Sequence, residues 1–130
     1  QVVRDYLLAR LAALRGTGQA SRGVSVPSPA RKEFGKMAAV KVLGWLDTDG
    51  YPTLIPALSL QPAGEGALVC RRQRHYPGPA SGALVAANVL TPEAISYQAK
   101  GLWARDGAVG TIQVQEVYAG GPPIPGARIV

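Results

Sequence analysis

Residues 41–56 have the sequence KVLGWLDTDGYPTLIP, and this stretch decides the fold class. In its first half Val42, Gly44 and Leu46 alternate with Lys41, Leu43 and Trp45, and a period of two over this length is that of a β-strand. The segment from Asp47 to Gly50 ends in an Asp-Gly pair, which tolerates the positive φ of a tight hairpin turn. Residues 51–61 predict the return strand. Pro52 and Pro56 require an edge or a bulge there, because proline has no amide hydrogen to donate.

Four more strand-like segments follow this hairpin, separated by short turns. The predicted strands cover residues 67–72, 83–90, 94–105 and 109–119. Turn signals lie at residues 62–66, at 91–93 and at the Asp106-Gly107 pair. About six short strands at regular spacing, joined mainly by hairpin turns, are typical of an antiparallel barrel or sandwich. We therefore expect a mainly β fold.

A helix is predicted at the start of the chain. Residues 2–15 carry apolar side chains at helical spacing, and Gly16 is a suitable residue to end the helix. The apolar stripe consists of Val3, Leu7, Leu11 and Leu14. We expect this helix to pack outside the barrel.

The chain divides into two parts by composition. Residues 16–30 are dominated by Gly, Ser and Pro and predict a linker or extended surface segment, and residues 30–37 predict a short second helix. We therefore expect an N-terminal helix and linker over residues 1–37 and a β-domain over residues 38–130.

Length and composition fit one globular domain. The chain has 130 residues, of which 47% are hydrophobic. It has no apolar run of the length that a membrane helix needs, and its first residues lack the features of a signal peptide, so we expect no membrane association. A lone cysteine cannot form an internal disulfide, and we predict a cytoplasmic protein. The first residue is not Met, which leaves open whether the chain belongs to a longer protein.

Arginines are concentrated where the third predicted strand ends. Residues 71–75 have the sequence RRQRH, and the chain as a whole has a net charge of +6. Arginine side chains bind phosphate oxygens in a bidentate manner, and loop amides can add further donors. The cluster therefore predicts a phosphate site. The alternative is a solvated loop with extra positive charge.

Other chemically active side chains have two interpretations each. Trp45 and Trp103 could stack on a planar ligand or anchor the core. Cys70 could be a reactive thiol beside the arginines, or a small apolar residue of its strand. His75 could serve as an acid or base, but no acid–base partner adjoins it in the sequence.

No motif supplies catalysis without a cofactor. The sequence has neither a phosphate-binding loop ending in Gly-Lys-Ser/Thr nor a Gly-x-Gly-x-x-Gly that opens a helix. One histidine and one cysteine rule out most conventional zinc sites, and we predict no metal. If the protein is an enzyme, a bound cofactor must provide the reactive group.

The hairpin resembles the opening hairpin of FMN-binding split barrels, the pyridoxamine 5'-phosphate oxidase-like family. Those proteins show an apolar strand, an Asp-x-x-Gly-x-Pro turn and a return strand with a further proline, as residues 41–56 do here. Residues 66–72 are similar to the next strand of the family, and residues 96–103 to a later one. The resemblance, which covers about residues 38–119, implies an antiparallel split β-barrel, and the helix over residues 2–15 lies outside it.

The resemblance also implies a cofactor, FMN, at the interface of a homodimer. By position, the residues that would line the isoalloxazine ring are Pro56, Ala57, Leu58 and Ser59. The residues that would approach the ribityl chain and the phosphate are Val69, Cys70, Arg71, Arg72 and Gln73. The implied activity is that of a flavin-dependent oxidoreductase whose electron donor, such as a nicotinamide, reaches the exposed face of the ring.

A second hypothesis is a non-enzymatic β-barrel that binds nucleic acid or a protein partner as a module of a larger protein. Aromatic residues make up only 6%, and neither tryptophan adjoins the arginine cluster in the sequence, which argues against nucleic acid. A homodimer is also expected from the residues themselves, because apolar side chains occupy both faces of the predicted strands. They are Leu43, Trp45, Leu54, Ile55, Leu58 and Leu60.

Overall fold

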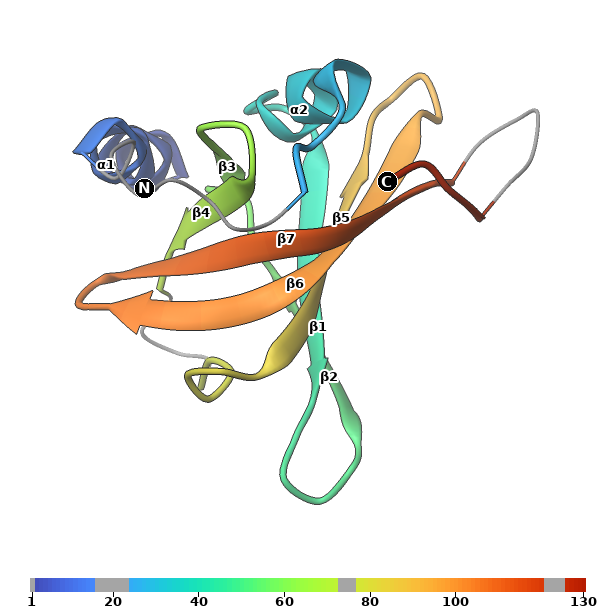
Figure 1. The fold of residues 1–130 in the computed structure, drawn as a ribbon. Helices are drawn as coiled ribbons and strands as arrows, with labels where there is room; N and C mark the ends of the chain where they lie inside the picture. The colour runs from blue at the N-terminus through green and yellow to red at the C-terminus, as the bar shows by residue number, and fades with distance from the viewer. Residues whose placement is uncertain (1, 16–23, 73–76, 121–125) are drawn as a thin grey trace.

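The computed structural model describes residues 2–15, 24–72, 77–120 and 126–130. Within these residues the chain forms two helices and eight strands (Figure 1). The helices are α1 (Val2–Arg15) and α2 (Ser28–Phe34). The strands are β1 (Val40–Leu46), β2 (Pro52–Pro56), β3 (Gln61–Ala63), β4 (Ala67–Arg71), β5 (Leu84–Leu90), β6 (Ser96–Asp106), β7 (Val109–Ala119) and β8 (Ala127–Arg128).

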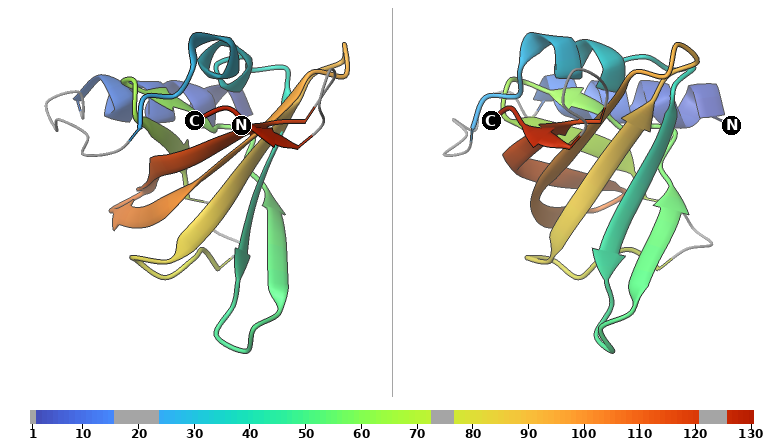
Figure 2. Two further views of the ribbon diagram at one scale, coloured as in Figure 1. Left: turned by 45° about the vertical axis from the view of Figure 1, so that its right-hand side comes forward. Right: turned by 90° about the vertical axis from the view of Figure 1, so that its right-hand side faces the viewer.

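The strands form a single antiparallel sheet. Its order is β2-β1-β5-β6-β7-β4-β3, and β8 adds a short pairing to β7. The sheet curves around one core without closing, and β2 and β3 are its two edges (Figure 2). The predicted mainly β, antiparallel fold with an N-terminal helix is confirmed. The expected number of about six strands is too low, because the short strands β3 and β8 were not foreseen.

The hairpin between β1 and β2 has the turn that its sequence predicts. The Asp47 carboxylate accepts hydrogen bonds from the amides of Asp49 and Tyr51, each at 2.9 Å. Gly50 has a φ of +83°, a conformation that glycine adopts without steric cost. The register then pairs Gly44 with Leu54, and a Cβ on Gly44 would overlap the Leu54 side chain.

Residues 51–61 do not form one return strand. The chain leaves β2 at Pro56 and enters β3 at Gln61, so residues 57–60 cross from one edge of the sheet to the other. Buried and exposed side chains alternate only as far as Ser59, because Leu60 and Gln61 are both buried after it. The chain turns there, with the Leu60 amide donating to the Ala57 carbonyl at 3.0 Å, and the backbone changes its pairing partner.

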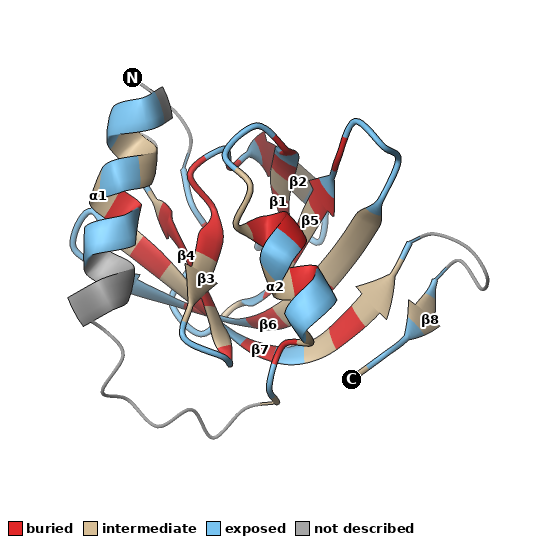
Figure 3. Cartoon of the chain, turned by 90° about the horizontal axis from the view of Figure 1, so that it is seen from above, coloured by how far each residue is buried: buried red, intermediate tan, exposed pale blue. Residues whose placement is uncertain are grey.

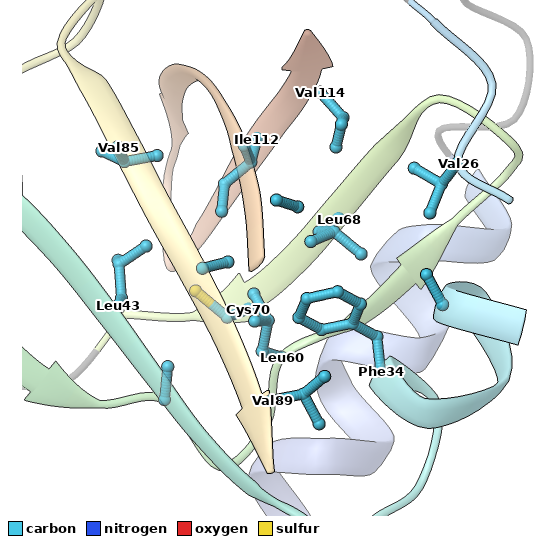
Figure 4. Close-up of a cluster of buried hydrophobic side chains, with 14 of the residues drawn as sticks. Val26, Phe34, Leu43, Leu60, Leu68, Cys70, Val85, Val89, Ile112 and Val114 are labelled. Carbon is cyan, nitrogen blue, oxygen red and sulfur yellow. The ribbon is translucent and has the colours of Figure 1, made fainter. Parts of the chain in front are cut away.

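The core lies inside the curved sheet, beneath α2. Figure 4 shows Val26, Phe34, Leu60, Leu68 and Cys70 among its buried side chains. Phe34 ends α2 and is fully buried, so this short helix covers the end of the barrel with an aromatic side chain. The polypeptide before β1 therefore contributes to the same core as the strands.

Helix α1 packs outside the sheet against β3 and β4, as predicted (Figure 3). The apolar stripe that defines it in the sequence nevertheless faces away, because Val3, Leu7 and Leu11 are each more than half exposed. Ala9 is fully buried, and polar contacts also hold the helix: the Tyr6 hydroxyl donates to the Gly35 carbonyl, and the Gln61 amide donates to the Tyr6 carbonyl at 2.8 Å. No helix in the described part of the chain is long and apolar enough to cross a membrane.

Candidate functional site

A small hollow opens where the end of β4 approaches β2 and β6. Its volume is about 20 Å³, room for roughly one water molecule. It is lined by Leu43, Ile55, Pro56, Ala57, Cys70, Arg71, Arg72, Gly78, Pro79 and Trp103. The hollow therefore brings together two groups that the sequence places apart, the apolar run around Pro56 and the arginines at the end of β4.

One wall of the hollow is apolar. Ile55 and Ala57 are buried and Pro56 is exposed at the rim, so the predicted ring-facing residues Pro56 and Ala57 lie at the hollow. Leu58 is exposed and does not line it. Ser59 is buried, and its Oγ accepts a hydrogen bond from the Arg71 amide at 2.9 Å. Ser59 thus positions the backbone of the arginine rather than facing a ligand.

The two faces of strand β4 have different surroundings, the barrel core on one side and α1 on the other. Cys70 points into the barrel core (Figure 4), and burial raises the pKa of its thiol to about 12. The thiol is therefore protonated at neutral pH, and Cys70 is a packing residue. Val69 lies on the opposite face, towards α1, and so does not belong to the core cluster inside the barrel.

The two arginines have different partners. Arg71 ends β4, and its Nε lies 3.2 Å from the Asp5 carboxylate of α1. Arg72 is exposed, its guanidinium donates to the Gly107 carbonyl at 2.8 Å, and its amide donates to the Ala108 carbonyl. Both arginines line the hollow, and each already has an internal partner. Gln73 and His75 lie outside the described residues.

Trp103 forms part of the lining, whereas Trp45 lies elsewhere. The Trp103 ring packs over Gly110, where any larger residue would overlap it. Trp103 is 3% exposed, and its indole N–H has no hydrogen-bond partner among the residues that the structure describes. A buried donor without an acceptor is costly, so a ligand oxygen reaching this nitrogen would be stabilised. Trp45 is half-buried and packs against the core.

Solved structures with the same architecture are known. HupZ from Group A Streptococcus superposes with a TM-score of 0.61 at 12% sequence identity, over 78% of this chain and 98% of that chain. A histidine-to-alanine variant of HupZ gives a TM-score of 0.59 at 13% identity, over 72% and 98%. The fold is split-barrel-like. At this level of identity the likeness shows the fold alone, and neither a family model nor a curated protein matches the sequence.

Two charged residues near the hollow of this split barrel were not identified from the sequence. Asp5 has no local signal, because nothing in its helix indicates a contact with β4. Lys41 had one, because it shares the alternating face of β1 with Leu43, which predicts burial. Lys41 is fully buried, and its Nζ donates to the Leu60 carbonyl at 2.7 Å and lies 5.3 Å from the centre of the Tyr6 ring. Burial lowers the pKa of Lys41 to about 8.

Proposed function

We propose that this split-barrel protein binds FMN and acts as a flavin-dependent oxidoreductase. One observation carries the proposal: the apolar wall at Pro56 and Ala57 and the two basic residues Arg71 and Arg72 border the same hollow. A flavin phosphate has the same two halves, a flat apolar ring and a dianion. The arginines offer the donors that a phosphate requires, and the wall offers the surface that a ring covers.

The residues present fit the cofactor in chemistry, whereas the hollow is too small to enclose it. A cavity of about 20 Å³ cannot bury a flavin, whose site must have several hundred cubic ångströms. We therefore infer that the ring lies across the apolar wall and that a second copy of the chain covers its other face. In this proposal the flavin lies at a homodimer interface.

Each lining residue has a distinct role in this proposal. Arg71 and Arg72 hold the phosphate, Pro56 and Ala57 contact the ring, and the Trp103 indole donates to an oxygen of the ligand. A bound flavin supplies hydride acceptance and donation, which no side chain of the hollow provides. The electron donor, such as a nicotinamide, would approach the ring from the solvent side.

Flavin titration tests the proposal. We expect FMN to quench intrinsic tryptophan fluorescence and to bind more tightly than riboflavin, because riboflavin lacks the phosphate. Arg71→Ala should weaken FMN by roughly tenfold to a hundredfold, the value of a charged hydrogen bond, and leave riboflavin unchanged. Arg72→Ala should act in the same direction. Arg105→Ala is the control, because Arg105 is exposed and does not line the hollow.

Other results would change the assignment. If riboflavin and FMN bind with equal affinity, the phosphate does not bind at the hollow and its assignment to the arginines is wrong. Haemin, a planar cofactor that carries carboxylates, serves as a second probe. If the protein binds haemin much more tightly than FMN, the ligand is haem-like rather than a flavin. If neither probe binds, the non-enzymatic interaction module is the remaining function.

A further inference from the structure

The arginine assigned to the phosphate is already paired with an acidic side chain from another element. Asp5 lies in the first turn of α1, and its carboxylate is 3.2 Å from the Nε of Arg71. Both side chains are about one quarter exposed, at 28% and 25%. The pair is therefore accessible to a ligand from the surrounding solvent and less screened than a fully exposed pair.

The position of Asp5 is fixed by its neighbour Tyr6. The Tyr6 hydroxyl and carbonyl are bonded to Gly35 and Gln61, and the ring lies beside the Lys41 ammonium group. These contacts come from the end of α2, from β3 and from β1, so they restrain the first turn of α1. On the other side of the pair, the Ser59 hydroxyl holds the Arg71 amide. The carboxylate is thus held against the guanidinium from both sides.

We propose that Asp5 is an internal competitor for the anion site at Arg71, and that it makes the docking of α1 sensitive to ligand charge. This inference rests on the proposed function, because it takes Arg71 to be the phosphate-binding residue. A phosphate monoester is a dianion near pH 7. Once bound at Arg71, it lies close to the Asp5 carboxylate, and like charges at that separation repel. The ligand must therefore share Arg71 with Asp5 or displace it.

The competitor has two consequences. Ligands with a dianionic group lose part of their affinity to the repulsion, whereas neutral ligands such as riboflavin lose none. Binding of a dianion also weakens the contact that joins α1 to β4, and the remaining Tyr6 contacts then carry the helix alone. The strength with which α1 is held against β4 therefore depends on whether the anion site is occupied.

The experiment compares Asp5→Asn with wild type in FMN and riboflavin titrations at low ionic strength. We expect FMN to bind about threefold to tenfold more tightly to Asp5→Asn, because one negative charge is removed beside the phosphate, with riboflavin unchanged. Asp106→Asn is the matched control, because Asp106 is an exposed aspartate on β6 that forms no ion pair with Arg71. Amide hydrogen exchange over residues 2–15 should accelerate when FMN binds wild type, and less so in Asp5→Asn. Circular dichroism checks that the variant retains its fold, and Asp5→Ser repeats the test if Asp5→Asn does not.

The outcomes separate this inference from the function on which it rests. If FMN binds wild type and Asp5→Asn equally well, Asp5 is no competitor, although the flavin site stands. If riboflavin tightens as much as FMN, the substitution acts through the packing of α1 rather than through charge, and the inference is wrong. If no flavin binds either protein, both the proposed function and the competitor are overturned.

Discussion

Lys41 is a buried lysine without an acidic partner among the described residues. Its ammonium group has one carbonyl acceptor, from Leu60, and one aromatic face, from Tyr6. Neither compensates for the loss of water around a full charge, which is why the pKa falls from 10.5 to about 8. The folded protein therefore binds this proton more weakly than the unfolded chain does.

This difference predicts that the free energy of unfolding rises with pH above about pH 8. In that range the folded protein releases the Lys41 proton while the unfolded chain keeps it up to about pH 10.5. We expect a gain of about 1 kcal/mol between pH 7 and pH 9, measured by urea denaturation. Lys41→Met, which keeps the length of the side chain, should lose this dependence. If the free energy of unfolding depends on pH in the same way in wild type and in Lys41→Met, Lys41 is not the group responsible.

The measurement must stop near pH 9, because Cys70 has the opposite effect above that value. Burial raises the pKa of its thiol from 9.0 to about 12, so the unfolded chain loses this proton before the folded protein does. Deprotonation of the thiol in the unfolded chain favours unfolding. Comparing each protein with its Cys70→Ala version separates the two groups.

The hairpin of β6 and β7 depends on one close backbone approach. The register slips between Lys100 and Gly101, so that Gly101 pairs with Val114 while Lys100 pairs with Glu116. At the slip the two backbones approach so closely that a Cβ on Gly101 would overlap the carbonyl of Gln113. Backbone atoms cannot move aside as the end of a side chain can, so this position requires glycine.

Gly101→Ala should therefore destabilise the protein by roughly 1–3 kcal/mol, the range for overpacking that forces the backbone to shift. Thermal unfolding followed by circular dichroism measures the loss. Gly78→Ala is the control, because a Cβ there meets nothing within 4 Å. If the two variants melt at the same temperature, the close approach does not constrain the hairpin.

At the scale of the whole molecule, the outer face of the sheet carries apolar side chains that the chain itself does not cover. Leu54 is 69% exposed and lies across Gly44, and Leu84 is 59% exposed on β5. Of the residues that suggested a dimer in the sequence, Leu43, Ile55 and Leu60 are buried in the core instead. The apolar surface available to the proposed second copy is therefore smaller than the sequence indicates.

We predict that Leu54→Lys combined with Leu84→Asp prevents dimer formation. Light scattering at micromolar concentration should give wild type twice the chain mass of 13.5 kDa and give the double variant a single chain mass. Leu11→Lys is the control, because Leu11 is an exposed leucine on α1, away from this face. If the wild-type protein has the mass of one chain, no second copy covers the flavin ring, and the proposed homodimer site is wrong.

Local patterns predicted the elements better than their partners. The helix over residues 2–15 and the strand over residues 109–119 have the predicted bounds, because periodicity depends only on neighbouring residues. Burial of Cys70 also followed from its place in an apolar strand. The crossing at residues 57–60 did not follow, because the alternation of a strand continues to Ser59, beyond Pro56, where β2 ends.

The candidate site shows the same division between local and long-range information. The arginines at the end of β4 and the apolar wall at Pro56 were both named from the sequence, and the hollow brings them together. The ion pair of Arg71 with Asp5 joins residues far apart in the chain. No spacing or composition predicts it, because only the packing of α1 on β4 determines which charges meet.

The crossing at residues 57–60 has a consequence for how the sheet resists other strands. Exposed sheet edges recruit foreign strands and so promote aggregation. Here the two edges, β2 and β3, are tied to each other by the chain itself. The Lys41 carbonyl accepts from the Ala57 amide at 2.8 Å, and its side chain donates to Leu60, so one residue of β1 fastens both ends of the tie. Although no strand pairing joins β2 to β3, the four residues of the crossing therefore keep the two open edges of the sheet connected, and Lys41 fixes both ends of that connection.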